Sequence, residues 1–295
     1  MTRESLAWQS KLVLLAVLPF VGADVFLECQ WWLAHSPLVA ICTVGVSAIL
    51  GLITWKLRAA TSAAAATGAA ITASLIFATV TVPYQPLRTA LTPILAVSAL
   101  AFAATRAGRG KKEQSGTAEA RSGRSASQVA ANLGFASLVC MPPVQSWLVD
   151  TGRVPSIMSP MALFVLGLAA LAEAAGDTVS SEIGQILGGR PRMITTLRAV
   201  PPGTDGAVSI LGTLSGAVAA CLVSGAGTWA VHGDRSLFLV SWAGAVFGLL
   251  FDSLLGATLE AWGWLNNDLV NFLSTVSASC FVLAMLAIMP RHGVG

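Results

Sequence analysis

The stretch MALFVLGLAALAEAAGDTVSSEIG, residues 161–184, passes from a continuous apolar run into an acidic segment. A helix needs about 20 apolar residues to cross the hydrocarbon core of a bilayer, and the run is of that kind. The second half of the stretch carries Glu173, Asp177 and Glu182. Ionisable side chains at membrane depth are costly and usually functional. The stretch therefore predicts a membrane helix with part of a functional site at its end.

The composition of the whole chain is that of a membrane protein. Of its 295 residues, 55% are hydrophobic and only 11% are charged, and the mean hydropathy is +0.75. Soluble domains average about 25% charged residues. The net charge of +3 includes no long basic run with interleaved aromatics, which argues against nucleic-acid binding. The five cysteines stand singly, without metal-ligand spacing, and are interpreted as small core residues.

Apolar segments of spanning length recur along the chain and none indicates a strand. We predict an all-α, polytopic bundle of about nine transmembrane helices, a single integral membrane domain over residues 1–295. The start of the first segment, KLVLLAVLPFVGA, could instead be the core of a signal peptide. The predicted spans are 11–33, 37–55, 60–82, 87–104, 127–148, 156–177, 206–230, 236–258 and 269–290.

The basic residues predict the orientation of these spans. With the N-terminus in the cytoplasm, most of the 17 lysines and arginines fall inside. The exceptions are Arg88, Arg153, Arg235 and Arg291. We therefore predict an integral membrane protein, of the inner membrane if bacterial, with its active site on the cytoplasmic face. The predicted cytoplasmic loops are 105–128, 178–205 and 259–268.

The same orientation bears on histidine chemistry. All three histidines fall on the outer face or at the C-terminus, which argues against a histidine-based hydrolase or metal site on the cytoplasmic side. They are His35, His232 and His292.

Carboxylates in two spans are candidates for a metal site. Glu173 and Asp177 are four residues apart and share a helical face. Two carboxylates in a low-dielectric setting repel each other unless one is protonated or a cation lies between them. Asp252 falls within a later span, near its predicted cytoplasmic end. Mg²⁺ suits one or two carboxylates plus phosphate oxygens. The alternative is a solvated helix end, with Glu173 as a bystander among apolar neighbours.

The stretch GGRPRMITTLRAVPPGTDG, residues 188–206, has the residue types of an anion-binding loop. Arg192 can grip a phosphate in a fork, and two threonines follow it. PPGTDG predicts a turn, with Thr204 or Asp205 capping a helix that begins at about 206. A helix N-terminus favours an anion. The Walker and Rossmann glycine patterns are absent from the sequence, so the alternative is an ordinary polar loop.

Two further polar stretches lead into predicted helices. In FDSLLGATLEAWGWLNNDLVNFLS, Asn267 and Asn271 share a face, although Asn266 or Asn267 could serve only as a cap. In RAGRGKKEQSGTAEARSGRSASQVAAN the front half is predicted to be mobile, and Ser125 or Ser127 to cap a helix.

GDTVSSEIG, PRMITTLRAVPPGTDGAVSILGTLSG and FDSLLGATLEAWGWLNNDLVNFLST resemble the integral membrane family that includes plant phytyl-phosphate kinase. GRSASQVAANLG and TSAAAATGAAITASLIF fit the same pattern, so that the resemblance spans about 60–290. The family is distantly related to CTP-dependent polyprenol kinases. The resemblance implies transfer of the terminal phosphate of a nucleoside triphosphate, expected to be CTP, to an isoprenyl monophosphate.

The resemblance also implies roles for particular residues. Mg²⁺ is expected at Asp177 and Asp252, with Glu182 and Asp268 as additional acids. Asn267 and Asn271 would orient the substrate or metal-bound water. The nucleotide phosphates would be held by Arg192, Thr195 and Thr196, by Arg124 and Lys112, and by the turn Gly203, Thr204 and Gly206.

The expected partners are a nucleoside triphosphate, an isoprenyl phosphate whose tail lies in a groove between Gly-rich helices, and membrane lipids. A homo-oligomer stays open. One alternative is a membrane transporter, for which no internal repeat is visible. A second is a CDP-lipid synthase, which would release pyrophosphate instead of CDP, and a third is a scaffold without catalysis.

Overall fold

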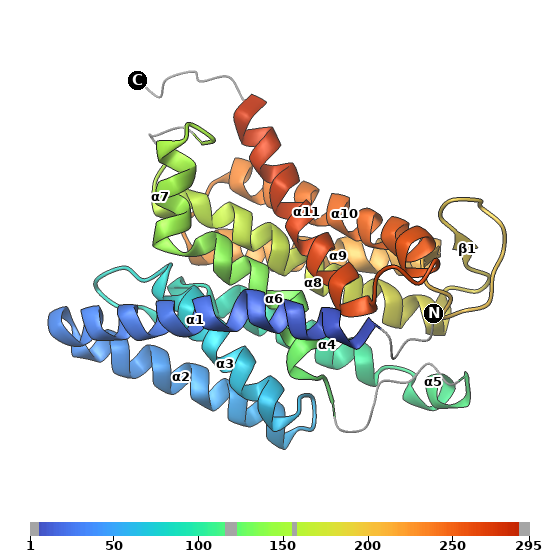
Figure 1. Ribbon diagram of the computed structural model, residues 1–295, viewed down its shortest axis with the longest axis horizontal. Coiled ribbons are helices and arrows are strands. Elements are labelled where there is room, and N and C mark those ends of the chain that lie inside the picture. The colour runs from blue at the N-terminus through green and yellow to red at the C-terminus, as the bar shows by residue number, and fades with distance from the viewer. Residues whose placement is uncertain (1–5, 116–122, 155–157, 289–295) are drawn as a thin grey trace.

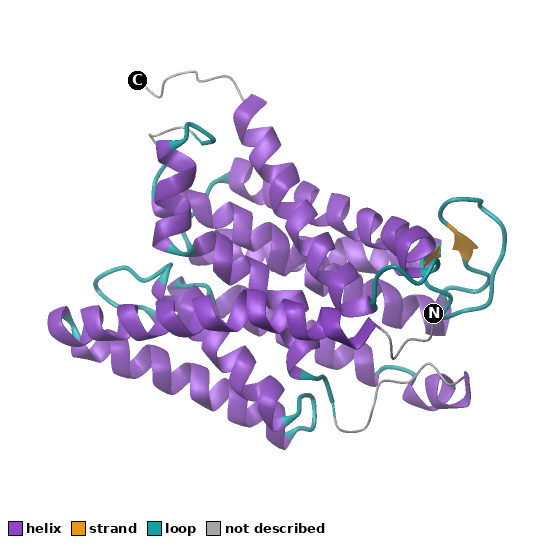
Figure 2. Ribbon diagram, in the orientation of Figure 1, coloured by secondary structure: helices purple, strands orange, loops and turns teal. Residues whose placement is uncertain are grey.

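The computed structural model describes residues 6–115, 123–154 and 158–288, which are predominantly helical (Figure 1, Figure 2). Within these residues, six helices are long and apolar enough to cross a membrane. They are α1 (Ala7–His35), α2 (Pro37–Lys56), α8 (Pro160–Leu187), α9 (Ile210–Ala230), α10 (Arg235–Leu255) continued by η3 (Gly256–Glu260), and α11 (Asn267–Ile288). The chain is therefore a polytopic helical membrane protein.

Three shorter apolar helices coincide with the remaining predicted spans: α3 (Ser62–Phe77), α4 (Leu91–Arg106) and α6 (Ala126–Cys140). They have 16, 16 and 15 residues. A straight crossing of the hydrocarbon core takes about 20 residues, so these helices are short for spans. The structure thus supports six candidate spans, and the count of nine stays a prediction.

The other elements are small. They include η2 (Pro86–Arg88), α5 (Arg109–Ser115), α7 (Pro142–Asp150) and the two strands β1 (Arg192–Met193) and β2 (Ala207–Val208). The strands pair antiparallel, with Arg192 opposite Val208. The expectation of no strands is therefore wrong for residues 188–208, which form a short two-stranded ribbon. The segment 109–115, predicted to be mobile, forms α5.

Helix α8 is the core of the bundle. Its most apolar window is 89% buried, against 17% to 39% for the other five long helices. It packs against α4, α6, α9, α10 and α11. A helix that is apolar all round belongs inside other helices, and this is where α8 lies. Large apolar side chains on the outer helices, such as Leu15 and Leu38, instead face outward as a lipid-facing surface does.

The described parts of the predicted cytoplasmic loops 105–128, 178–205 and 259–268 lie toward one end of the bundle, at the right in Figure 1. Arg106, at the end of α4, donates a hydrogen bond to the Leu57 carbonyl just after α2 (2.8 Å). At the opposite end Arg88 donates to the Trp229 carbonyl. Which end faces the cytoplasm stays a prediction. Four residues used to predict the orientation lie outside the described residues: Arg3, Arg121, Arg291 and His292.

Several helix boundaries differ from the prediction. The predicted span 127–148 is broken after Cys140, because Met141 is extended before Pro142 and proline disfavours a helical residue ahead of it. Helix α8 continues to Leu187, so Asp177 lies inside it and the first ten residues of the predicted loop 178–205 are helical. Asp252 likewise lies inside α10.

The predicted caps are partly right. Ser125 caps α6 in a capping box with Gln128, as expected. The Asn266 side chain accepts a hydrogen bond from the Leu269 amide at the start of α11 (3.0 Å). The cap predicted at Thr204 or Asp205 is wrong. Helix α9 begins at Ile210, four residues after the predicted start at 206. Its cap is Ser209, whose side chain accepts a hydrogen bond from the Gly212 amide (3.1 Å).

Candidate functional site

A polar cavity of about 290 Å³ opens at the end of the bundle that holds the ribbon. Five segments line it: the start of α6, the second half of α8, the loop 191–209, the end of α10 with η3, and the start of α11. We name it the polar pocket. The predicted site residues that line it are Arg124, Asp177, Glu182, Gly203, Thr204, Gly206, Asp252, Asn267 and Asn271.

Three acids meet at the inner side of the polar pocket. Asp177 on α8 and Asp252 on α10 line it, and Glu173 lies one turn deeper on α8, within electrostatic range of both. Glu173 is 1% exposed, and its Oε1 has no hydrogen-bond partner among the described residues. Oδ2 of Asp252 likewise has none. Buried carboxylate oxygens without partners are costly, which marks this cluster as a place where a ligand or cation would be stabilised.

The interpretation of Glu173 as a residue with only apolar neighbours is wrong. Ser274 of α11 is in hydrogen-bond contact with it, and the carboxylates of Asp177 and Asp252 lie within electrostatic range. The close approach of α10 depends on Gly248, since a Cβ at that position would stand 2.6 Å from the Glu173 Cγ. The sequence showed Asp177 one turn away on the same helical face, whereas Ser274 and Asp252 come from other helices.

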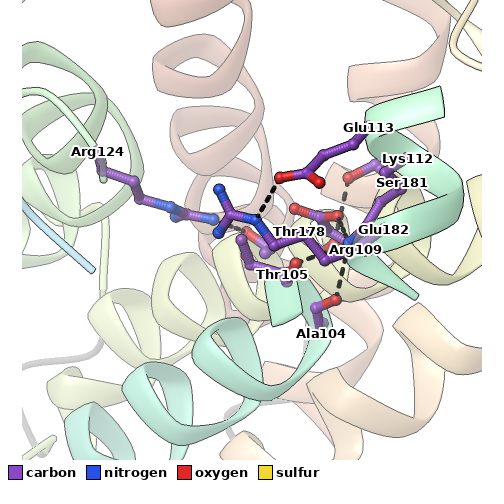
Figure 3. Close-up of polar contacts among 9 residues, drawn as sticks. All are labelled: Ala104, Thr105, Arg109, Lys112, Glu113, Arg124, Thr178, Ser181 and Glu182. Atoms are coloured by element: carbon purple, nitrogen blue, oxygen red, sulfur yellow. Dashed lines mark hydrogen bonds and ion pairs between the residues drawn. The ribbon is translucent and has the colours of Figure 1, made fainter. Parts of the chain in front are cut away.

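Arg124 is the cation placed against this cluster. Its Nη2 donates to the Thr178 hydroxyl of α8 (3.2 Å), as Figure 3 shows, and it lies near enough to Asp177 to attract it. The backbone holds it there, because the Arg124 amide donates to the Ala59 carbonyl and the Thr61 amide donates to the Arg124 carbonyl (both 3.0 Å). An arginine between a buried acid and a polar cavity is well placed to bind phosphate.

Lys112 was expected to help hold the nucleotide phosphates, but its side chain is directed elsewhere. Its side chain is 2% exposed, and Nζ donates to the Glu182 carboxylate (2.5 Å) and to the carbonyls of Thr105 (2.8 Å) and Ala104 (3.2 Å) (Figure 3). It is absent from the described lining of the polar pocket. Lys112 therefore links α5 to α8 and α4, and the Glu182 carboxylate forms an ion pair with it.

The ribbon also departs from the prediction. Arg192 is exposed and donates through Nη1 to the Leu197 carbonyl (2.9 Å). Thr195 and Thr196 are exposed on the same loop, and these three residues are outside the described lining of the polar pocket. The loop reaches the pocket through Pro191, next to Arg192, and through the turn 202–206.

Gly206 fixes this turn against η3. Its φ of +72° is a conformation that side chains disfavour, and a Cβ there would collide with the Ala257 backbone. The turn that carries Gly203, Thr204 and Gly206 thus packs against η3, and it lines the polar pocket together with Asp252. The glycine turn therefore lines the polar pocket, whereas Arg192, Thr195 and Thr196 are outside its described lining.

Helix α11 contributes its first two turns. Asn267 and Asn271 line the polar pocket, while Asp268 is buried and outside the described lining. Gln9 of α1 fixes the connection ahead of this helix by donating to the Trp264 carbonyl (2.8 Å) and accepting from the Asn266 amide (2.7 Å). Nothing in the sequence linked Gln9 to this segment.

Two other residues of the polar pocket were not among the predicted site residues. Glu260 of η3 adds a further acid, within electrostatic range of Asp252. Gln185 on the last turns of α8 lines the pocket, with its buried Oε1 lacking a hydrogen-bond partner in the described part of the chain. Helical spacing could have found Gln185, since it lies eight residues after Asp177 and so near the same face.

The oxygen atoms that line the polar pocket suit a hard cation only if a bound phosphate compound supplies further oxygens. Among the described residues, no group of three or more His, Cys, Asp or Glu side chains is arranged to hold a metal ion. Asp177 and Asp252 offer two carboxylates from facing helices, and Asn267 and Asn271 offer amide oxygens. Mg²⁺ is usually bound by one or two carboxylates plus phosphate oxygens and water. The pocket therefore suits Mg²⁺ carried by a phosphate compound better than a metal bound by protein alone.

Fold and site together define an integral membrane protein with a buried acidic pocket at one end of a helix bundle. The chain belongs to the family described as Integral membrane protein DUF92, whose model matches residues 45–279. The resemblance drawn from the motifs is thereby confirmed. No solved structure matches this chain.

Three relatives are similar over part of their length. An uncharacterized membrane protein of Methanocaldococcus jannaschii is 40% identical over 131 residues, 42% of this chain and 55% of the relative. An uncharacterized membrane protein of Synechocystis is 31% identical over 209 residues, 66% of this chain and 72% of the relative. Protein VTE6, chloroplastic, of Arabidopsis thaliana is 30% identical over 196 residues, 65% of this chain and 57% of the relative. The chain thus spans little more than half of the first and third.

Proposed function

We propose that this chain is a membrane-embedded kinase that transfers the terminal phosphate of a nucleoside triphosphate, CTP, to an isoprenyl monophosphate such as phytyl phosphate. The products are the isoprenyl diphosphate and the nucleoside diphosphate. Membership of the family that includes plant phytyl-phosphate kinase and the similarity to chloroplastic VTE6 support this class of reaction. The site is proposed to face the cytoplasm, where nucleotides are available.

The observation that carries the proposal is the meeting of Asp177, Asp252 and Arg124 in one polar pocket. They come from α8, from α10 and from the segment before α6, which are far apart in sequence. Phosphoryl transfer needs little covalent chemistry from a protein, because positioning and charge neutralisation supply most of the catalysis. A pocket with opposed carboxylates, an arginine and a glycine turn has the groups for both tasks.

The proposed step is an in-line displacement at the terminal phosphorus. An oxygen of the isoprenyl phosphate forms a bond to this phosphorus, the bond to the bridging oxygen breaks, and the nucleoside diphosphate leaves with the electron pair. A general base is not required, since a phosphate monoester is already an anionic nucleophile. Mg²⁺, when bound, would neutralise phosphate charge, and Asp177 and Asp252 are the residues that would hold it.

The other side chains of the pocket position the reactants. Arg124 would hold a transferred or acceptor phosphate by paired hydrogen bonds. Asn267 and Asn271 would orient phosphate oxygens or water from the first turns of α11. The turn 203–206 would close over the nucleotide. Glu182 is left out of the direct contacts, because its carboxylate is paired with Lys112.

The test uses the purified chain in detergent with Mg²⁺, phytyl phosphate and CTP labelled at the terminal phosphate. We expect label in a lipid diphosphate, together with stoichiometric CDP. Label in free pyrophosphate, with the cytidine moiety in the lipid, would instead identify a CDP-lipid synthase. Failure to label any lipid across a panel of isoprenyl phosphates and nucleotides would contradict the proposal.

A further inference from the structure

A second cavity, of about 140 Å³, lies beside the polar pocket between α2, α3, α4 and α6. Most of its wall is formed by apolar side chains, among them Leu50, Ile94, Val97, Ala101 and Leu133. We name it the apolar groove. A cavity with such walls among membrane helices suits a hydrocarbon chain better than water or a polar metabolite.

Arginines gather at one end of the apolar groove. Arg58, Arg106 and Arg109 line it together with Arg124, and its described lining contains no acid. The Arg106 guanidinium is anchored on the Leu57 carbonyl and lies 4.3 Å from the centre of the Phe102 ring. Arginine is the preferred residue for binding phosphate at several oxygens. A hydrocarbon cavity with an arginine-rich mouth is complementary to a lipid with a phosphate head.

The apolar groove and the polar pocket meet at two shared residues. Arg124 and Asn132 line both. Asn132 is held by its own helix, because its Nδ2 donates to the Gln128 carbonyl (2.8 Å). A phosphate at this junction would have its lipid tail on one side and the acids Asp177 and Asp252 on the other.

We infer that the apolar groove binds the head end of the acceptor: the phosphate-bearing end of an isoprenyl monophosphate lies in it, with the first part of its tail between α3 and α4. Its phosphate lies at the arginine end and meets the nucleotide at Arg124. The identity of the acceptor rests on the proposed function. The placement of the tail rests on the apolar walls, the arginines and the shared residues.

Gly68 on α3 gives a direct test of this placement. It lies on the groove wall, and a Cβ added there would meet only the Val129 Cγ1, at 3.7 Å. Gly68→Ala should therefore fit, while Gly68→Leu extends into the groove. Gly22→Leu on α1 is the matched control, because a Cβ at Gly22 has nothing within 4 Å.

The first measurement is photo-crosslinking of the full chain in detergent with a diazirine-bearing farnesyl phosphate, without nucleotide. We expect adducts on α3 and α4, a strong loss of labelling in Gly68→Leu, little loss in Gly68→Ala and none in Gly22→Leu. A diazirine-bearing farnesol should label weakly if the arginines hold the phosphate, and inorganic phosphate should compete only at high concentration. All variants are compared at equal monodispersity by gel filtration.

The second measurement is the KM for each substrate in the kinase assay. Gly68→Leu should raise the KM for the long-chain acceptor about tenfold or more, as loss of apolar pocket space does, and leave the KM for CTP unchanged. Adducts in the groove without turnover would support the groove as a lipid-binding site and refute the proposed kinase activity. Turnover with adducts confined to other helices, or with an unchanged acceptor KM in Gly68→Leu, would refute the groove as the acceptor site and support the kinase activity. Absence of any adduct on folded protein would also refute the groove as the acceptor site.

Discussion

Replacing Lys112 by methionine tests how the short helix α5 is held. The change keeps the volume of the side chain and removes the ammonium that binds Glu182 and the carbonyls of Ala104 and Thr105. Breaking a fully buried ion pair by removing one partner costs about 3–5 kcal/mol. Glu182 is 13% exposed and lines the polar pocket, where water can solvate it, so the cost is lower. We expect about 1–2 kcal/mol, close to the loss of one charged hydrogen bond.

The expected loss is local. Helix α5 has seven residues and cannot be stable on its own, since isolated helices need about 12–15 residues. Lys112→Met should therefore speed hydrogen exchange in 105–115 about 5- to 30-fold, the factor that corresponds to 1–2 kcal/mol. Exchange in α8 and α9 should stay unchanged.

The control is Arg109→Met on the same helix. Arg109 pairs with Glu113, but both side chains are exposed (35% and 42%), and such pairs contribute about 0–1 kcal/mol. Its exchange should stay near that of the wild type. In the double variant with Glu182→Gln, the effect of Lys112→Met should shrink, because the two residues act through one contact. Unchanged exchange in Lys112→Met, or equal effects of Lys112→Met and Arg109→Met, would refute the proposed anchoring.

Two further predictions concern the loop and the arginines. Arg124→Ala should raise the KM for CTP about tenfold or more, as expected for a lost phosphate contact. Arg192→Ala should leave this KM unchanged. Steady-state kinetics with both variants checks this, and the reverse pattern would place the phosphate site on the ribbon. Gly206→Ala should lower the thermal stability more than Gly189→Ala, because both have positive φ but only Gly206 also meets the Ala257 backbone; a melting experiment in detergent that gives equal shifts would contradict this packing.

The helices were largely predictable from the sequence because membrane spans are decided by local apolarity. Every predicted span coincides with at least one helix, and the error at 127–148 arose because an apolar run conceals a break that Pro142 imposes. The end of α8 was predicted too early for a related reason. Polar residues after Asp177 indicated a loop, whereas in the structure they form a helical wall of the polar pocket.

The site was only partly predictable, because its geometry depends on contacts between distant segments. Asp177 and Asp252 stand out as acids within apolar runs, and the structure brings them into one pocket. Arg192 was predicted as the main phosphate-binding residue and Arg124 as an additional one, yet only Arg124 lines the polar pocket, since Arg192 is exposed on the ribbon. The composition around Lys112 predicts a mobile segment, but its side chain is buried against α4 and α8.

The central claim is that Asp177 and Asp252 act together on one nucleotide in the polar pocket. The most direct measurement is the kcat for transfer of the terminal phosphate of CTP to phytyl phosphate in Asp177→Asn, Asp252→Asn and the double variant. We predict a loss of about 100-fold or more in each single variant, and a double variant hardly worse than either, because residues that act as a unit are not additive. Folding is checked by gel filtration and melting temperature. Wild-type turnover in either single variant, with the protein folded, would contradict the account.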